Sequence, residues 1–394
     1  MHFARRMAGV RPSAIRELLA LGDDPQVTSF GGGYPDPAHF PVTALRTAYE
    51  DVLAAQAGQA LQYTASNGLP GLRAAIADRM RADGDRTTPE QVLVLQGAQQ
   101  GLDLVAKLLI DPGDLIVTAD PTFLGALIAF NPYEPAYLAI EGDEEGLDTD
   151  ALAAALERGA RPRFVYVVPD FANPTGATLS LARRHHLLEL ARRHDVLVLE
   201  DTPYRALRYE GETLPTLSSL DTDGRVIHLG SFSKTHAPGL RLGWAAATPQ
   251  LIEALGLLKL AADTQTATLA MTAVTRLLRD FDLDTHIGVV RDAYRAKRDL
   301  MVATMAAEFP AGVRVSVPEG GLFTWVSFPE GFDAAEFMAQ RALPRARVAY
   351  VPGATFFPVH HQPNHARFSF SGVAAPQLVD AVTRLGALLR EELD

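Results

Sequence analysis

Short apolar runs rich in β-branched residues alternate with longer amphipathic segments over about residues 50–290. A short apolar run without polar alternation is typical of a strand that is buried on both faces of a parallel sheet. Helical patterns lie between the runs, for example at 100–110 and 181–194. The runs themselves lie at 92–95, 115–117, 164–168, 196–199 and 226–229. This alternation predicts an α/β sheet with functional groups at the carboxyl ends of its strands.

The stretch from about residue 290 onward has a different pattern. We expect a long polar helix over 290–309 and a last helix over 376–392. Four short strands are predicted between them, at 313–317, 322–326, 348–351 and 366–370. We therefore expect three parts. Residues 1–45 form an N-terminal segment that joins the small domain and covers the site, residues 46–290 form a large domain, and residues 291–394 form a small α+β C-terminal domain.

Composition excludes several classes of function. The chain has 394 residues, which is too long for one ordinary core and agrees with two domains. Its net charge of −11 argues against non-specific binding to nucleic acid or to an anionic membrane. The N-terminus lacks a signal-peptide pattern, and no apolar run reaches the roughly 20 residues of a membrane span. Cysteine is absent, which excludes disulfides and thiol nucleophiles and is compatible with the cytoplasm, the location we expect.

The segment 230–244 carries one lysine among glycines and hydroxyl residues, directly after the last of the apolar runs. A lysine at the end of a buried strand is desolvated, which lowers the pKa of its amine and makes the amine nucleophilic. Ser231, Ser233 and Arg241 lie close to Lys234 in the sequence and could together hold a phosphate group. A reactive lysine beside a phosphate site is what an enzyme of pyridoxal 5′-phosphate (PLP) needs, because the lysine binds this phosphorylated cofactor covalently.

Two further polar side chains lie where strands are predicted. Asp201 follows the run at 196–199, where a carboxylate could face a pyridine nitrogen and keep it protonated, and Tyr204 could bond the cofactor's 3′-oxygen. The alternative for Asp201 is a helix cap. Arg367 lies in a short strand with aromatic neighbours, where its planar guanidinium suits a carboxylate. The alternative for Arg367 is a surface position.

Three other segments are ambiguous when each is taken alone. Gly97 opens a predicted helix, whose free N–H groups could bind phosphate. Asn173 begins an Asn-Pro-Thr-Gly stretch, which by itself is only a turn signal. Phe123 is compatible with a core position as well as with a stacking role. Whether these segments have a functional role is decided by the order in which they and the other motifs occur along the chain.

Along the chain, the motifs occur in the order phosphate loop, aromatic ring, Asn-Pro-Thr-Gly, aspartate, lysine and arginine. In this order of motifs the chain resembles the fold-type I PLP-dependent aminotransferases of class I/II. Within them it is similar to the 2-aminoadipate and kynurenine aminotransferase branch, which also supplies the effector domain of MocR-type regulators. This similarity rests on the segments 14–17, 29–33 and 318–325. The resemblance implies a large domain with a mainly parallel, seven-stranded-type sheet between helices, and a smaller α+β domain.

The resemblance also implies PLP as cofactor and a role for each matching residue. Lys234 would bind PLP and carry the substrate's Cα proton, Asp201 would face the pyridine nitrogen, and Phe123 would stack on the ring. Asn173 and Tyr204 would both bond the 3′-oxygen. The residues implied to contact the phosphate are Gly97, Ala98, Gln99, Ser231, Ser233, Arg241 and the neighbouring subunit's Tyr63. Those implied to contact the substrate are Arg367, Gly33, Asn173 and, for a distal carboxylate, Arg16.

We therefore expect an aminotransferase that moves the amino group of an L-amino acid to a 2-oxo acid, with 2-oxoglutarate as acceptor, by a ping-pong mechanism. The role of Tyr63 implies a homodimer with shared active sites. A PLP-dependent lyase or decarboxylase on the same fold is the alternative. A ligand-sensing regulator is less favoured, because about 30 residues precede the glycine-rich turn at 29–36 and the chain is acidic.

A metal site is not expected. His360, His361 and His365 crowd one loop, but no acidic or thiol partner lies near them at ligand spacing.

Overall fold

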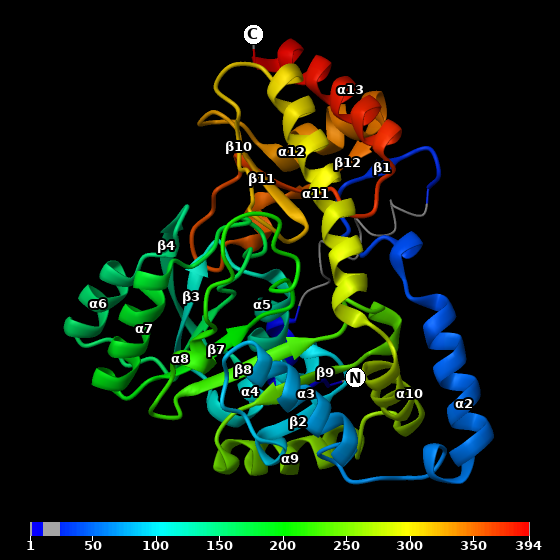
Figure 1. The fold of residues 1–394 in the computed structure, drawn as a ribbon. Coiled ribbons are helices and arrows are strands. Elements are labelled where there is room, and N and C mark those ends of the chain that lie inside the picture. Colours follow the sequence, from blue (N-terminus) through cyan, green and yellow to red (C-terminus); the bar gives the residue numbers. More distant parts are fainter. Residues whose placement is uncertain (1, 11–23, 394) are drawn as a thin grey trace.

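The computed structural model describes residues 2–10 and 24–393, so the predicted helix that contains Arg16 lies outside the described residues. A large part built on one sheet forms the lower half of Figure 1, and a smaller part lies above it. The long helix α11 (Leu283–Glu308) runs from one part to the other.

The large sheet has the strand order β2-β9-β8-β7-β6-β3-β4-β5. Neighbours from β8 to β4 pair in parallel, whereas β9 and the short β5 are antiparallel to their neighbours. The bounds are β2 (Val92–Leu95), β3 (Leu115–Asp120), β4 (Ala136–Asp143), β5 (Gly146–Leu147), β6 (Phe164–Val167), β7 (Leu197–Asp201), β8 (Val226–Ser231) and β9 (Gly243–Ala246). The predicted mainly parallel sheet is confirmed, but among the described residues it has eight strands where seven were implied, and β4, β5 and β9 were not expected from the apolar runs.

Alternate residues of the central strands face two separate cores, as the period of two along a strand requires. Phe164 and Tyr166 face one core, which contains side chains of α4, α5 and α9. Val165 and Val167 face the other, which contains side chains of α6, α7 and α8. Both faces of the sheet are therefore covered, which explains the continuous apolar runs in the sequence.

The helices predicted at 100–110, 181–194 and 376–392 correspond closely to α4, α7 and α13, whereas the helix predicted at 290–309 is α11, which begins earlier, at Leu283. The α-helices of the described residues are α2 (Val42–Ala60), α3 (Pro70–Ala82), α4 (Ala98–Leu109), α5 (Leu124–Phe130), α6 (Thr149–Glu157), α7 (Leu181–His194), α8 (Leu217–Leu220), α9 (Pro249–Asp263), α10 (Thr268–Asp280), α11, α12 (Ala334–Phe337) and α13 (Ala375–Leu393). Among the described residues, no helix combines the length and the hydropathy that a membrane crossing requires.

The small part contains a four-stranded sheet in the order β10-β11-β14-β13. Its strands are antiparallel and have the bounds β10 (Arg314–Val315), β11 (Phe323–Ser327), β13 (Val351–Pro352) and β14 (His365–Ser369). The N-terminal strand β1 (Thr28–Ser29) pairs in parallel with β12 (Val348–Ala349) in the same part of the molecule. The predicted boundaries at 45 and 290 fall inside α2 and α11, and the division of the chain into domains stays a prediction.

Candidate active site

Lys234 lies in the loop that follows β8, whose last residue is Ser231. Its amine donates a hydrogen bond to the carbonyl oxygen of Gly33 at 2.9 Å, so the glycine-rich N-terminal turn lies directly against it. Burial, with the positive charges of Arg367 and Arg241, lowers the pKa of Lys234 to about 8. A substantial fraction of the amine is therefore neutral near pH 8, as a nucleophile or a base requires.

Asp201 is the last residue of β7, the strand next to β8, and its side chain is buried. The Oδ2 atom of Asp201 accepts a hydrogen bond from the hydroxyl of Tyr166 at 3.0 Å. The Oδ1 atom is buried and has no hydrogen-bond partner among the described residues. Burial raises the pKa of Asp201 to about 6, and the bond from Tyr166 and the charge of His228 oppose this rise. A buried carboxylate oxygen without a donor marks a place where a ligand's N–H group would fit.

Asn173, Tyr204 and Arg367 form one hydrogen-bonded group. The Nδ2 atom of Asn173 donates to the Tyr204 hydroxyl at 3.4 Å, and its Oδ1 accepts from Nη1 of Arg367 at 2.8 Å. Nη2 of Arg367 donates to the carbonyl of Gly31 at 2.6 Å. The Nε atom of Arg367 is buried and unbonded within the described chain. The group thus holds a buried guanidinium whose Nε has no partner among the described residues.

Aromatic rings and burial define the surroundings of this group. The guanidinium of Arg367 lies 4.3 Å from the ring centroid of Phe323 and 5.1 Å from that of Phe356. Burial lowers the pKa of Arg367 to about 10, which still leaves it protonated at neutral pH. Burial also raises the pKa of Tyr204 to about 12, and its ring centroid lies 6.0 Å from the amine of Lys234.

The other end of the site is built from the start of α4 and the loop after β8. Gly97 precedes α4 and has φ of 76°, a left-handed conformation that favours glycine. A Cβ atom at Gly97 would lie 2.5 Å from Nη2 of Arg241, so this residue must be small for the arginine to approach. The hydroxyl of Ser231 donates to that of Ser233 at 2.9 Å. Free N–H groups of α4, two hydroxyls and an arginine are together suited to a phosphate.

These residues fit PLP, the cofactor that the sequence implies. The reactive lysine has a lowered pKa, the unpartnered Oδ1 of Asp201 offers an acceptor for a protonated ring nitrogen, and Gly97 leaves room beside Arg241. Gln99 lies in the same turn, with its amide bonded to the carbonyl of Gly125 at 2.7 Å. The aromatic Phe123, which precedes α5, packs partly buried against the core that contains α4.

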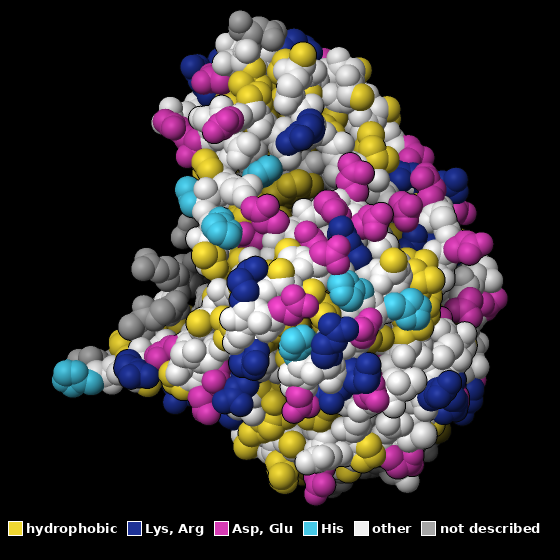
Figure 2. All heavy atoms as spheres, turned by 90° about the vertical axis from the view of Figure 1, so that its left-hand side faces the viewer, with side chains coloured by type: hydrophobic (Ala, Val, Ile, Leu, Met, Phe, Trp, Pro, Cys, Tyr) yellow, Lys and Arg dark blue, Asp and Glu magenta, His cyan; other side chains and the backbone are white. Residues whose placement is uncertain are grey.

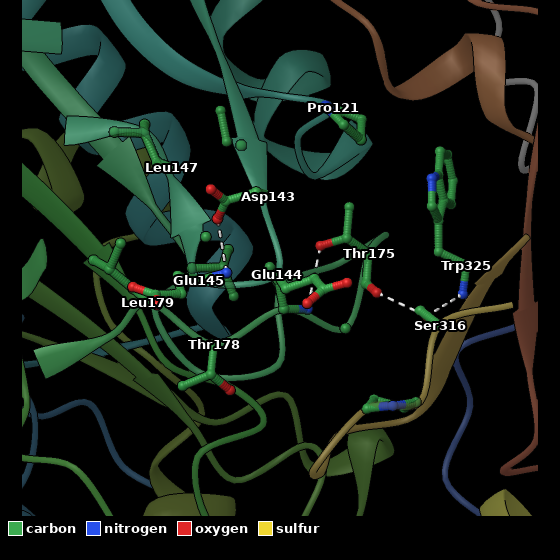
Figure 3. A pocket seen from close by; sticks show the side chains of 18 of the residues that line it. Pro121, Asp143, Glu144, Glu145, Leu147, Thr175, Thr178, Leu179, Ser316 and Trp325 are labelled. Carbon is green, nitrogen blue, oxygen red and sulfur yellow. Dashed lines mark hydrogen bonds between the residues drawn. The ribbon is translucent and has the colours of Figure 1, made fainter. Parts of the chain in front are cut away.

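A cleft of about 1440 Å³ separates the large part from the small part beside this cluster. Its lining includes Asn173 and Tyr166 but not Lys234. We therefore locate the candidate site from the chemistry of its side chains and not from the size of the cleft. Figure 2 shows acidic side chains around the hollow between the two parts. Figure 3 shows Asp143, Glu144 and Glu145 on one side of the cleft and Trp325 on the other.

Tyr63, His360 and His365 do not take part in the hydrogen-bonded cluster. Tyr63 is 81% exposed on the loop after α2. Arg16 lies outside the described residues. The loop histidines have partners other than a metal: His360 pairs with Asp120 at 2.6 Å, and His365 stacks on Trp325.

Tyr166, Phe323 and Phe356 shape the site but were not predicted to do so, and of these Tyr166 bonds to Asp201 directly. Tyr166 carried a usable signal, because a hydroxyl within the apolar run 164–168 needs a buried partner. Phe323 and Phe356 carried none, since their contact with Arg367 depends on how distant segments pack.

Comparison with known proteins agrees with this chemistry. Residues 26–385 match the family model of the class I and II aminotransferases. The chain is 38% identical to aromatic-amino-acid aminotransferase 1 of Thermococcus litoralis, over 100% of this chain and 95% of that protein. It is similar to the crystal structure of the alpha-aminoadipate aminotransferase of Thermus thermophilus in complex with N-(5′-phosphopyridoxyl)-L-leucine, with a TM-score of 0.92, 36% identity and coverage of 99% and 98% of the two chains. It is also similar to that of Pyrococcus horikoshii kynurenine aminotransferase, with a TM-score of 0.94, 36% identity and coverage of 100% and 98%.

The family match and the two structural likenesses each span nearly the whole chain, so they cover both parts of the fold and the cluster between them. The predicted cofactor and reaction type are confirmed, and no finding favours a lyase or a decarboxylase. The chain belongs to the class I and II aminotransferases and is a PLP-dependent transaminase.

Proposed function

We propose that the enzyme transfers the α-amino group of an L-amino acid to 2-oxoglutarate by a ping-pong mechanism, at the site centred on Lys234. The observation that supports this proposal most strongly is that the amine of Lys234, whose pKa is lowered, and the buried guanidinium of Arg367 lie in one cluster. Lys234 bonds to Gly33, and Arg367 bonds to Gly31 two residues earlier in the same turn. A proton carrier and a carboxylate-binding group are thus held a short distance apart.

We propose that the cofactor is held at three places. The phosphate is held by the start of α4 (Gly97, Ala98 and Gln99) and by Ser231, Ser233 and Arg241. Asp201 holds the ring nitrogen, Asn173 and Tyr204 hold the 3′-oxygen, and Phe123 covers the ring. When bound, PLP supplies an aldehyde that captures the amino group and a ring that withdraws electrons from the substrate's Cα.

We propose that Lys234 moves the proton. Its pKa of about 8 leaves a neutral Nζ atom available near neutral pH, and a neutral amine can take the proton of the substrate's Cα. Tyr204 keeps its own proton over the working range, because its pKa is raised to about 12. Its hydroxyl is therefore a permanent donor beside the lysine.

We propose that Arg367 binds the α-carboxylate of the substrate. Asn173 and Gly31 fix both terminal nitrogens of the guanidinium, and the rings of Phe323 and Phe356 exclude water from it. A fixed and desolvated guanidinium recognises a carboxylate strongly, since little ordering is left to occur on binding.

The names of the relatives guide the choice of donor. They act, by name, on aromatic amino acids, α-aminoadipate and kynurenine, which all have longer side chains than alanine. We propose that the donor of this enzyme is likewise an L-amino acid with a long side chain. Arg16 remains our candidate for binding a distal carboxylate, such as that of 2-oxoglutarate.

Replacing Arg367 with glutamine is expected to lower kcat/KM for an L-amino acid by roughly 100-fold, because the charge-assisted bonds to the carboxylate are lost. The measurement compares each L-amino acid with the corresponding amine that lacks the α-carboxylate, for which we expect little further loss. Arg341→Gln, which changes an exposed arginine of the small part that does not line the cleft, is the matched control and should behave as wild type. An equal loss for both substrate types would contradict the assignment.

The pKa of Lys234 predicts a pH dependence of stability in the cofactor-free enzyme. Between pH 8 and 10.5 the folded chain binds fewer protons at Lys234 than the unfolded chain, so wild-type stability rises with pH in this window. Lys234→Met should therefore be more stable than wild type at pH 7, by at most roughly 3 kcal/mol, and the difference should shrink toward pH 10. Urea unfolding of both proteins at pH 7, 8.5 and 10 measures it. A difference that does not vary with pH would show that the amine is not desolvated.

We propose that two chains form a homodimer with shared sites. Leu61 and Tyr63 are 67% and 81% exposed, and Leu257 and Leu260 of α9 are 66% and 51% exposed. The loop at 61–64 is tied to the start of α10, just after α9, since Thr268 bonds to the carbonyl of Gln62 at 2.9 Å. An apolar surface of this kind on one side of a protein is typical of an interface.

A shared site can be tested by mixing two defective variants. Lys234→Ala lacks the lysine, and Tyr63→Ala lacks the ring that would reach the neighbouring site. After the subunits are exchanged, hybrid dimers contain one site with both residues, so activity should rise to about one quarter of wild type at equal mixing. If the mixture shows only the average of the two variants, Tyr63 does not serve the other chain.

A further inference from the structure

Tyr166 lies in β6, in the middle of the large sheet, and its side chain is fully buried. Its ring packs edge-on against Phe130, with 5.6 Å between the centroids. Its hydroxyl lies 3.0 Å from Oδ2 of Asp201. The proposed mechanism gives this tyrosine no role, although the only hydrogen bond of its hydroxyl within the described residues goes to Asp201, which the mechanism needs.

The strand register explains why these two side chains meet. Tyr166 of β6 pairs with Leu199 of β7, and Asp201 lies two residues further along β7. Residues two apart on a strand face the same side, so Tyr166 and Asp201 share one face of the sheet as diagonal neighbours. A long aromatic side chain can span this diagonal, whereas a short polar one cannot.

The two carboxylate oxygens of Asp201 have different surroundings. Oδ2 is bonded to Tyr166, while Oδ1 is buried without a hydrogen-bond partner in the described chain. His228 lowers the pKa of Asp201 through its charge but does not bond to it. Its Nδ1 lies 3.0 Å from Oε2 of Glu200 and its Nε2 lies 3.1 Å from the hydroxyl of Thr202. Within the described residues, the Tyr166 hydroxyl is therefore the one side-chain group that anchors this carboxylate.

The hydroxyl is also a dependable donor. Burial and the neighbouring Asp201 raise the pKa of Tyr166 well above its usual value, so it does not ionise at any working pH. Donation to Oδ2 favours the charged form of Asp201, against the effect of burial. An anchored oxygen also fixes the plane of the carboxylate, and this determines the direction of the other oxygen.

We propose that Tyr166 is a positioning residue for cofactor binding: its hydroxyl anchors Oδ2 of Asp201 and so presents Oδ1 to the pyridine nitrogen of PLP. This inference rests on the proposed function, which assigns Asp201 to that nitrogen. Tyr166 itself needs no contact with the cofactor or the substrate.

The test is a double-mutant cycle whose readout is the dissociation constant of PLP, obtained by dialysing the holoenzyme and measuring the retained cofactor. Tyr166→Phe removes the hydroxyl and keeps the ring against Phe130. We expect it to raise the dissociation constant about tenfold, as the loss of one hydrogen bond to a charged group implies. In an Asp201→Asn background the same change should raise it less than about threefold, because the charged acceptor is gone.

Tyr350→Phe is the matched control. Tyr350 is also fully buried, and its hydroxyl donates to the carbonyl of Ala334 at 2.7 Å in the small part of the molecule. It reports the general cost of losing a buried tyrosine hydroxyl, so it should lower the thermal midpoint about as much as Tyr166→Phe. It should leave the PLP dissociation constant unchanged.

The outcomes distinguish an error in the proposed role of Asp201 from an error in the inferred role of Tyr166. If Asp201→Asn leaves PLP binding unchanged, the proposed role of Asp201 is wrong. If Asp201→Asn weakens binding but Tyr166→Phe does not, the inference about Tyr166 alone is overturned. The inference also fails if Tyr166→Phe has the same effect in both backgrounds, since Tyr166 would then act on the fold in general.

Discussion

The parallel alignment of β6, β7 and β8 is the constraint on which the site depends. Parallel strands end at one edge of a sheet, so Asp201 at the end of β7 and Lys234 just after β8 are brought to the same edge. Asn173 follows β6 and arrives there too. These strands are buried on both faces, and a polar group at their ends is therefore desolvated. The same burial that stabilises the sheet lowers the pKa of Lys234 and raises that of Asp201.

The second constraint is the junction between the large and small parts. Arg367 of β14 reaches across this junction to Asn173 in the large part and to the N-terminal turn at Gly31. The contact of 2.6 Å between Nδ1 of His360 and Oδ2 of Asp120 crosses it as well, close to the segment that leads to Phe123. Arg367, proposed to bind the substrate, is thus attached to Asn173, which is proposed to hold the cofactor. We expect the relative position of the two parts to affect both kinds of binding together.

Much of this arrangement was predictable from the sequence, for a physical reason. Lys234 and Asp201 each follow an apolar run, and the ends of buried strands are where charged groups need a function. The order of the motifs then identified the cofactor. By contrast, the apolar run at 136–140 in β4 has only one β-branched residue, Ile140, which is also the only buried residue of the strand. The strand β9 consists of small residues and one tryptophan. The bonds of Tyr166 and Gly31 depend on strand register and long-range packing, which a single sequence does not specify. The partner of Tyr63 would belong to another chain.

The central claim is that Lys234 binds PLP and that the bound cofactor accepts an amino group. The direct measurement is the absorbance spectrum of the purified holoenzyme before and after L-glutamate is added in the absence of any 2-oxo acid. Our account predicts a visible band that disappears on addition of glutamate and is replaced by the near-ultraviolet band of the cofactor's amine form, with release of one 2-oxoglutarate per site. A protein that shows no visible band even after incubation with PLP would contradict the assignment of Lys234. A visible band that no L-amino acid changes would contradict amino-group transfer at this site.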